Sequence, residues 1–423
     1  MAEPGPTGGL RIRVRMTARA IDEPHRVSSQ LELLFDLTFV VAVSFATAEL
    51  AHSVAAGAGP DAAVGFLEVF FAIWWAWMNF TWFASAYDTD DVAYRLLTML
   101  QMAGVLVLAA GVPAAARDAD YRAVTTGYLI MRTGLVAQWL RASVEDPGFR
   151  STARRYAAGI AAAQVGWLAF LLAGGYDSPV TRNAGFLALV ALELAVPRWA
   201  ERARPTTWHP HHMAERYGLF TIILLGEIVL AATTAVQRTI DAARISAALL
   251  TVAACALLLV FAHWWMYFLH PAGRGLAQRR EHSYRWGYGH YAVFSALAAL
   301  GAGLDVAVEQ TAGTVAASPT AVAYAVAVPV AVFLLALEAV HATIAAAPAA
   351  QHVAVLGGAV AVLLAPLATP ATSPATAVAA ITVLCVAVTA VTTVARRRAE
   401  DGHTPARRPV IADVPSDERK VPA

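Results

Sequence analysis

The sequence predicts an all-α protein, a polytopic transmembrane helical bundle of about twelve spans. Of its 423 residues, 58% are hydrophobic and 14% are charged, whereas a soluble globular chain has about 25% charged residues. The mean hydropathy is +0.55. Apolar segments long enough to cross a bilayer, which takes roughly 20 residues, recur along most of the chain.

These segments are predicted to be helices because lipid offers the backbone no hydrogen-bond partners, so a spanning segment has to satisfy them itself. The last two segments are dominated by Ala, Val and Pro. The polar flanks 1–24 and 396–423 are predicted to be disordered, which leaves 25–395 as the transmembrane domain. In chain order the predicted spans are 31–52, 62–84, 95–115, 121–141, 155–174, 183–200, 216–236, 244–268, 288–307, 319–344, 352–368 and 373–395.

The distribution of arginine predicts the orientation. Alternate loops are rich in arginine, and such loops stay in the cytoplasm. Both termini are then cytoplasmic, which requires an even number of spans, and twelve fits. The arginine-rich set comprises Arg11, Arg13, Arg15, Arg19, Arg26, Arg150, Arg154, Arg155, Arg198, Arg202, Arg204, Arg274, Arg279, Arg280, Arg285 and Arg396 to Arg398.

Composition also argues against several classes of function. The net charge of +1 gives no indication of a nucleic-acid partner, and the expected partners are membrane lipids and an unknown small molecule or ion. Cys255 and Cys385 lie in apolar runs and are interpreted as core residues. No Walker loop, dinucleotide fingerprint, Gly-x-Ser-x-Gly elbow or HExxH motif is present, so neither an ATP-driven pump nor a soluble-type hydrolase domain is indicated, and no cofactor is expected.

Two carboxylates in the first span are the most informative residues. Glu32 and Asp36 lie four residues apart and therefore share one face of a helix. An ionised Asp or Glu in hydrocarbon costs roughly 2.5–3.5 kcal/mol on insertion scales. Such residues normally face a partner, a cavity or water, so Glu32 and Asp36 indicate a polar interior.

Other polar residues also fall within the spans. Arg132 lies in the middle of the fourth, and Glu227, at similar depth in the seventh, is its expected partner, either as a structural ion pair or as a proton or ion relay. Most of the others fall toward the cytoplasmic side, which predicts a polar vestibule open to the cytoplasm. The candidates for a substrate site or proton relay are Glu32, Asp36, Asn79, Arg132, Arg141, His212, Glu215, Arg216, Glu227, His263 and His290.

An acidic loop follows the second span. Asp88, Asp90 and Asp91 lie within four residues, and Arg95 opens the next span. Three carboxylates at this spacing are a candidate metal site, where a divalent cation could hold a diphosphate. The alternative, which is favoured, is a helix-start cap, since an Asp before a helix accepts backbone N–H bonds.

The chain also shows signs of a duplication. The block 75–80 (WAWMNF) resembles 263–268 (HWWMYF), and Glu32 begins the first span much as Glu215 begins the seventh. These pairs motivate the hypothesis of two parallel six-helix halves, 25–210 and 211–395, with a site between them, as in several transporter folds.

Four stretches resemble the bacterial low temperature requirement protein A (LtrA) family. They are ELLFDLTFVVAV from Glu32, YDTDDVAYRLLTMLQMAGVLVLAAGV from Tyr87, MRTGLVAQWLRA from Met131 and HMAERYGLFTIILLGEIV from His212; a weaker match is HWWMYFLHPAG from His263, followed by YGHYAVFSALAALGAGL from Tyr288. The resemblance implies a polytopic protein of the bacterial cytoplasmic (inner) membrane. The family name reflects a cold-growth phenotype, and no catalytic residues carry over from it.

Three functions fit the sequence. The preferred one is a secondary transporter or permease for an ion or small solute, in which buried carboxylates, arginines and histidines exchange protons. The second is a membrane-embedded enzyme acting on a lipid or isoprenoid diphosphate, with Mg²⁺ at the acidic loop. The third is a non-catalytic membrane protein of stress or cold adaptation. The balance is against an enzyme but leaves that question open.

Overall fold

The computed structural model describes residues 12–403 except 22, 24, 25, 242–244, 314 and 372. The described residues form helices and no strand, which confirms the predicted fold class, and each predicted span falls on a long helix. The helices are α1 (Gln30–Ala55), α2 (Pro60–Tyr87), α3 (Val92–Asp118), α4 (Arg122–Glu145), α5 (Arg150–Leu172), α6 (Pro179–Glu201), α7 (Pro210–Asp241), α8 (Ala247–Phe268), the short α9 (Ala272–Gln278), α10 (Ser283–Thr311), α11 (Pro319–Ala342), α12 (Ala349–Leu364) and α13 (Pro374–His403).

The lengths and compositions of these helices suit a bilayer. Among the described residues, 11 helices are long and apolar enough to cross a membrane. The remaining long helix, α4, carries Arg132 and Arg141 and is less apolar, as its sequence requires. The chain is therefore a helical membrane protein.

Polar side chains fix where several helices begin. Ser29, Ser178, Ser246 and Ser318 each accept a backbone N–H in the first turn of α1, α6, α8 and α11. At α1 the carboxylate of Glu32 also accepts the backbone N–H of Ser29, which completes a capping box. The start of α1, and with it the position of Glu32, is thus fixed locally.

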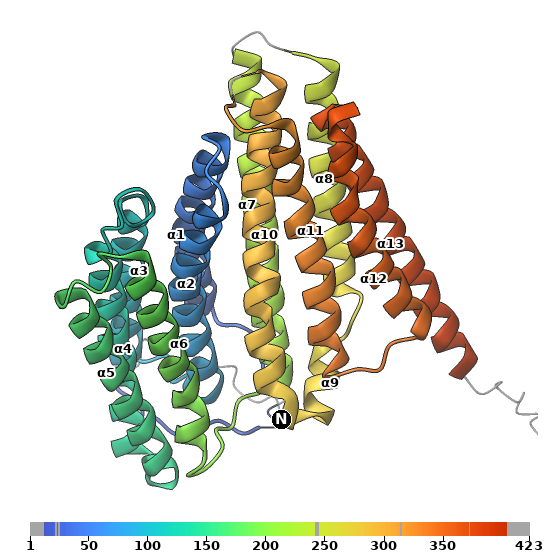
Figure 1. Ribbon diagram of the computed structural model, residues 1–423. Coiled ribbons are helices and arrows are strands. Elements are labelled where there is room, and N and C mark those ends of the chain that lie inside the picture. The colour runs from blue at the N-terminus through green and yellow to red at the C-terminus, as the bar shows by residue number, and fades with distance from the viewer. Residues whose placement is uncertain are drawn as a thin grey trace, which may run out of the picture.

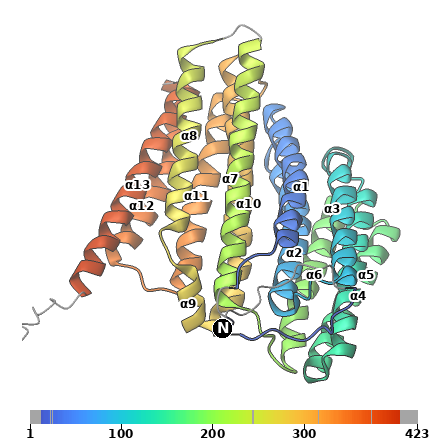
Figure 2. The same ribbon diagram turned by 180° about the vertical axis from the view of Figure 1, so that it is seen from behind.

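The helices form two groups that lie side by side (Figures 1 and 2). The α1–α6 group occupies one side of the molecule, and the α7–α13 group occupies the other. The two groups share part of their packing: α1 packs on α2 and α3 as α7 packs on α8 and α10, and the series α3–α4–α5–α6 resembles α10–α11–α12–α13. They differ in that α13 also packs on α8 and α11, whereas α6, among the described residues, has no comparable packing on α2 or α4. Contacts between the groups come mainly from α1 and α2 against α7 and α10.

The closest helix pair in each group is brought together by glycine. A Cβ atom on Gly127 of α4 would lie 2.3 Å from the backbone nitrogen of Leu108 on α3. A Cβ atom on Gly303 of α10 would lie 2.1 Å from the carbonyl oxygen of Ala325 on α11. Small residues allow such close approach of helices in membranes. The α3–α4 and α10–α11 pairs occupy the same place in the two packing series, as a duplication would produce.

The two ends of the bundle differ in charge. We call the end where α1 begins and α13 ends the basic end, because the described members of the arginine-rich loop set lie there. The sequence predicts disorder through residue 24, but residues 12–21 pack on this end, where Met16 is fully buried and its backbone N–H donates to Glu145 at 2.6 Å. At the other terminus α13 continues to His403, beyond the predicted boundary at 395, and residues 404–423 lie outside the described part.

Candidate functional site

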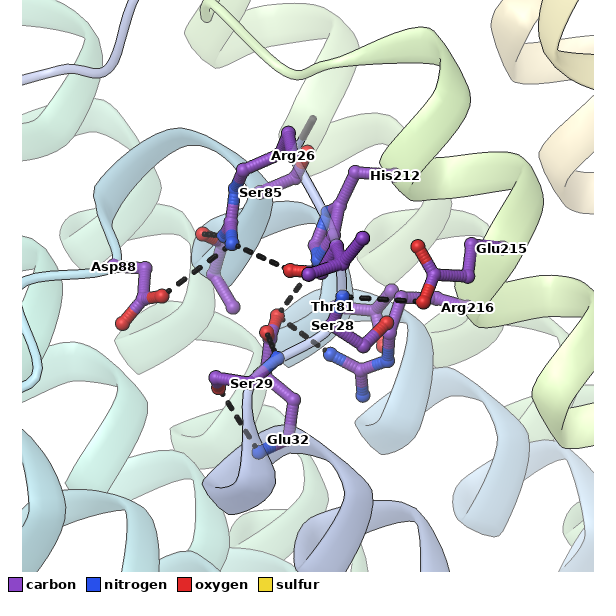
Figure 3. Close-up of polar contacts among 12 residues, drawn as sticks. Arg26, Ser28, Ser29, Glu32, Thr81, Ser85, Asp88, His212, Glu215 and Arg216 are labelled. Carbon is purple, nitrogen blue, oxygen red and sulfur yellow. Dashed lines mark hydrogen bonds and ion pairs between the residues drawn. The ribbon is translucent and has the colours of Figure 1, made fainter. Parts of the chain in front are cut away.

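Four of the predicted site residues meet between the two helix groups, near the basic end. Figure 3 shows three of them, Glu32, His212 and Arg216, with their surroundings. Glu32 and Asp36 come from the first turns of α1, and His212 and Arg216 from the first turns of α7. Each pair is spaced four residues apart, so each lies on one helical face. The exposed fraction of each of these four side chains is 0–1%. We call this set the Arg216 cluster.

The guanidinium of Arg216 bridges both carboxylates. Its Nη1 donates to Glu32 Oε1 at 2.7 Å, while Nε and Nη2 donate to Asp36 at 3.1 and 2.5 Å. The indole N–H of Trp77 on α2 donates to Asp36 Oδ1 at 2.7 Å. A planar guanidinium suits this fork-like recognition of carboxylates. The arrangement ties α1, α2 and α7 together across the boundary between the groups.

His212 completes the cluster and makes its charge variable. The ring Nε2 lies 3.1 Å from Glu32 Oε1. With a neutral histidine the cluster holds two carboxylates and one guanidinium, which leaves one negative charge. Histidine changes its charge more easily than any other side chain near neutral pH. A proton on His212, or a cation bound beside it, would balance the cluster.

A pocket of about 700 Å³ lies beside the cluster at the basic end. Its walls include Arg26, His209, His211 and Glu215, and His212 lies one turn along α7 from His209. Burial, followed by the nearby His211 and His212, lowers the pKa of His209. Charged and apolar side chains both line this pocket, and none of the four cluster residues does, so the polar vestibule stays a prediction.

Several polar atoms around the cluster have unused hydrogen-bonding capacity. Arg26 Nε, Ser28 Oγ, Tyr94 OH and His212 Nδ1 are buried and have no hydrogen-bond partner among the described residues. Buried polar groups in proteins are nearly always paired with protein or water. The unpaired atoms indicate that this region can accommodate water or a polar ligand.

Asp88 of the acidic loop lies close to the cluster and forms ion pairs with two arginines. Arg26 and Arg19 lie 3.5 and 3.6 Å from Asp88. Burial, with the negative charge of Glu32 nearby, raises the pKa of Asp88 to about 6 despite both arginines. Asp91 behaves in the opposite way: burial raises its pKa, but the hydrogen bond from Arg141 and two backbone N–H bonds lower it to about 2.

The three loop carboxylates point to different partners. Asp91 caps α3 by accepting the backbone N–H of Tyr94, and Asp90 bonds the exposed Arg95 at 2.7 and 2.8 Å. The described residues contain no group of three or more His, Cys, Asp or Glu side chains positioned to hold a metal ion. The capping interpretation therefore describes Asp91, and the arrangement offers no support for a shared cation.

The predicted partner of Arg132 is wrong. Its guanidinium lies 3.7 Å from Glu193 of α6 and donates to the Tyr128 hydroxyl at 2.5 Å, within the α1–α6 group. Glu227 instead lies on α7, in the other helix group, and its Oε2 is buried with no hydrogen-bond partner among the described residues. Depth along the membrane normal matched Arg132 to Glu227, but depth leaves the position within the membrane plane undetermined.

Glu193 is the centre of a second buried site. Its Oε1 accepts from Tyr128 at 3.0 Å, Gln164 at 3.2 Å and Trp167 at 3.3 Å, and its Oε2 accepts from Trp75 at 2.8 Å. We call these residues, with Arg132, the Glu193 cluster. The Trp-rich block of α2 thus belongs to the core and supplies one indole donor to each cluster, through Trp75 and Trp77.

Two further candidates lie at the basic end outside the Arg216 cluster. Arg141 bonds Asp91 at 2.8 and 2.5 Å and Glu145 at 3.2 Å. Glu215 accepts the backbone N–H of Ser28 at 3.2 Å and lines the pocket described above. Arg141 and Glu215 thus bond residues near the Arg216 cluster but no member of the cluster.

The remaining candidates are dispersed. The Asn79 amide donates to the carbonyl of Trp75 within α2 at 2.7 Å. His263 of α8 bonds the carbonyl of Leu259 at 2.7 Å, and His290 of α10 lies 3.1 Å from the Tyr267 hydroxyl. Along with Glu227, they do not share a site with Arg216.

Sequence reasoning missed Arg26, Tyr94, Glu193 and the two indole donors as site residues. Arg26 resembles any arginine of a basic loop, and Tyr94 any interfacial tyrosine. Glu193 lies near the cytoplasmic end of the predicted span 183–200, where it resembles other polar residues close to span ends. The sequence does contain a usable signal for Glu193. An acidic residue in a span requires hydrogen-bond donors, and Trp75 and Tyr128 are donors at a similar depth in neighbouring spans.

Together, the fold and its buried ionic clusters define a polytopic helical membrane protein with a charged site between two helix groups. Residues 27–391 match the bacterial low temperature requirement A protein (LtrA) family, so the chain belongs to that family. It is also similar to an uncharacterized protein of Rhizobium meliloti (strain 1021), with 27% identity over 209 residues, 47% of this chain and 49% of the relative. The matched region thus spans about half the length of that relative. No solved structure matches the chain.

Proposed function

We propose that this protein is a proton-coupled secondary transporter of a small ion or solute, with the Arg216 cluster as its coupling site. The observation that carries the proposal is the charge count of the cluster: two buried carboxylates share one guanidinium, and the third partner is a histidine. Binding or release of one proton at His212 changes the net charge of a site that has almost no solvent exposure.

The position of the cluster supports the same function. It lies where α1 and α7, the first helices of two similarly packed groups, face each other. In several transporter folds the substrate and coupling-ion sites lie between repeats that rock against each other. A change of charge at His212 would weaken or strengthen the contacts that hold α1 against α7 and so bias such a motion.

In this proposal the solute enters from the pocket beside the cluster. This pocket contains acidic, basic and histidine side chains, which suits a small polar solute or ion. By the positive-inside rule the basic end faces the cytoplasm, so we place the protein in the bacterial cytoplasmic membrane with both chain termini inside.

Solid-supported membrane electrophysiology on proteoliposomes tests the proposal. Concentration jumps of Na⁺, K⁺, chloride, phosphate and a set of amino acids would be applied to the wild type and to Asp36→Asn. The matched control is Glu227→Gln, which also neutralises a buried carboxylate at the α1–α7 boundary. We expect a current with at least one solute, which Asp36→Asn abolishes and Glu227→Gln retains.

Two results would overturn the proposal. One is the absence of current with every solute in the panel. The other is a current that Asp36→Asn leaves unchanged. The first result would favour a membrane-adaptation protein without turnover, and the second would show transport that does not depend on the Arg216 cluster.

A further inference from the structure

Three buried or half-buried carboxylates are spaced along the α1–α6 group from one end to the other, away from the Arg216 cluster. Glu68 of α2 lies toward the end opposite the basic end, Glu193 lies inside α6, and Glu201 lies at the basic end of α6. Glu193 and Glu201 are eight residues apart, about 12 Å along a helix. The exposed fractions of Glu68 and Glu193 are 5% and 1%.

Each carboxylate accepts a hydrogen bond from a tyrosine hydroxyl. Tyr121 donates to Glu68 at 3.0 Å, Tyr128 donates to Glu193 at 3.0 Å, and Tyr156 donates to Glu201 at 3.1 Å. The same tyrosine–glutamate pairing thus occurs three times, each time between different segments of the chain. We call these three pairs of protonatable side chains the ladder.

A cavity of about 30 Å³ separates the first two pairs. It is lined by Glu68 and Tyr121 on one side, and by Tyr128 and Trp167, both bonded to Glu193, on the other. A cavity needs roughly 10–15 Å³ to hold a water molecule. Tyr121 also lines a pocket of about 460 Å³ between the α1–α2 and α3–α4 connections, so the ladder begins near the end opposite the basic end.

A second cavity, of about 20 Å³, lies next to Glu201, and Trp75, which donates to Glu193, packs against Tyr288 in its wall. Tyr156 and Thr206 line it, and both donate to Glu201. Pro197 and Tyr288 form another part of its wall. Because proline has no N–H, the carbonyl of Glu193 lacks its usual helical donor, which leaves a polar backbone group on this side of Glu193.

We propose that Glu68, Glu193 and Glu201, together with their tyrosine partners, form a proton path across the α1–α6 group. Each carboxylate becomes neutral on taking up a proton and negative again on passing it onward. Each tyrosine hydroxyl gives up its proton while its oxygen accepts another, so no tyrosine remains charged and nothing is oxidised or reduced. Two arginines face the carboxylates of the path: Arg182 lies 3.5 Å from Glu68, and Arg132 lies 3.7 Å from Glu193. The path does not depend on solute binding at the Arg216 cluster.

Trp75 is the gate of this path. Its indole N–H donates to Glu193 Oε2 at 2.8 Å and its ring packs edge-on against Tyr288, whose side chain lines the second cavity. An indole N–H donates but cannot accept a proton. In the observed conformation Glu193 therefore exchanges protons more readily with the 30 Å³ cavity than with the basic end.

The test measures passive proton flux in sealed proteoliposomes that contain the pH dye pyranine. A potassium gradient with valinomycin drives protons inward, and no solute is present. Wild-type vesicles should acidify faster than protein-free vesicles. Glu193→Gln should bring the rate down to the protein-free level, and Trp75→Phe should raise it above wild type because the indole bond is lost.

One further variant protects the test from misfolding. Glu201→Gln changes a partly exposed group at a helix end, and it should slow the flux while the melting temperature stays near that of wild type. Glu227→Gln, which changes a buried carboxylate outside the ladder, should keep wild-type flux. Wild-type flux equal to that of protein-free vesicles, or wild-type flux in Glu193→Gln, would overturn the proposal.

Discussion

The Arg216 cluster and the Glu193 cluster are both buried, yet their charges are satisfied in different ways. Arg216 bonds two carboxylates directly, with distances of 2.5–3.1 Å. Glu193 accepts four neutral donors and lies 3.7 Å from Arg132. The first cluster depends on ionic bonds between two helix groups, and the second on neutral hydrogen bonds within one group.

The comparison separates two roles for buried charge. The Arg216 cluster carries surplus negative charge between the two helix groups. A proton bound there changes the ionic bonds that hold the two groups together. A balanced cluster inside one group can pass a proton without separating helices, because neutral donors keep the helices in place. The predictions below test this difference.

The largest expected effect is the loss of an arginine. Arg216→Met leaves two carboxylates buried without their cation and should lower the free energy of unfolding by about 3–5 kcal/mol. Arg132→Met leaves Glu193 with its four neutral donors, and the loss should be about 1–3 kcal/mol. Thermal unfolding of both variants in the same detergent measures the difference. Equal losses would contradict the distinction between the clusters.

The acidic loop should make stability depend on pH. The pKa of Asp88 is raised from 3.8 to about 6, so the folded state binds its proton more tightly than the unfolded state does. Stability should therefore fall as pH rises from about 4 to about 6, by up to about 3 kcal/mol for this group.

Asp88→Asn should remove that part of the slope. The matched control is Asp91→Asn, because the pKa of Asp91 is lowered from 3.8 to about 2 and its contribution is lost only as pH falls through that lower window. Unfolding midpoints measured at a series of pH values test both. A slope between about pH 4 and 6 that survives Asp88→Asn would contradict the assignment.

The two indole donors of α2 give a smaller and more closely matched comparison. Trp77→Phe leaves Asp36 with both bonds from Arg216 and should cost about 1 kcal/mol. Trp75→Phe leaves Glu193 Oε2 with only the distant Arg132 and should cost about 2 kcal/mol. Thermal unfolding of both variants measures this ranking, and the reverse order would contradict it.

The smallest effect is expected at the surface. Arg95 and Asp90 form an exposed pair at the start of α3. Surface ion pairs contribute little because water and salt screen them. Arg95→Ala should leave the unfolding temperature unchanged within error, and a clear decrease would show that the acidic loop is more tightly coupled to the bundle than its exposure indicates.

The sequence predicted the positions of the helices more accurately than it predicted which helices and side chains contact one another. Span length is imposed by the bilayer, so the apolar segments mark the helices directly. The shared face of Glu32 and Asp36 followed from helical spacing and is confirmed by their common bond to Arg216. Spacing within one helix is local information that a single sequence contains.

The missed features depend on which helices are neighbours. Arg132 has acidic residues within reach of its depth on more than one helix, and only the packing of α4 near α6 selects Glu193. The unpaired Tyr94 hydroxyl and the position of Arg26 depend on how the N-terminal segment folds back over α2 and α3. Hydropathy and charge along the chain do not determine which helices are neighbours.

The central claim is that a proton on His212 couples the Arg216 cluster to transport, and a pH gradient tests it most directly. Solute currents would be recorded in proteoliposomes with and without an inward proton gradient, in His212→Gln and in the matched control His263→Gln, which changes another buried histidine outside the cluster. The account predicts that His212→Gln alone loses the stimulation by the gradient. Equal stimulation in both variants would contradict it.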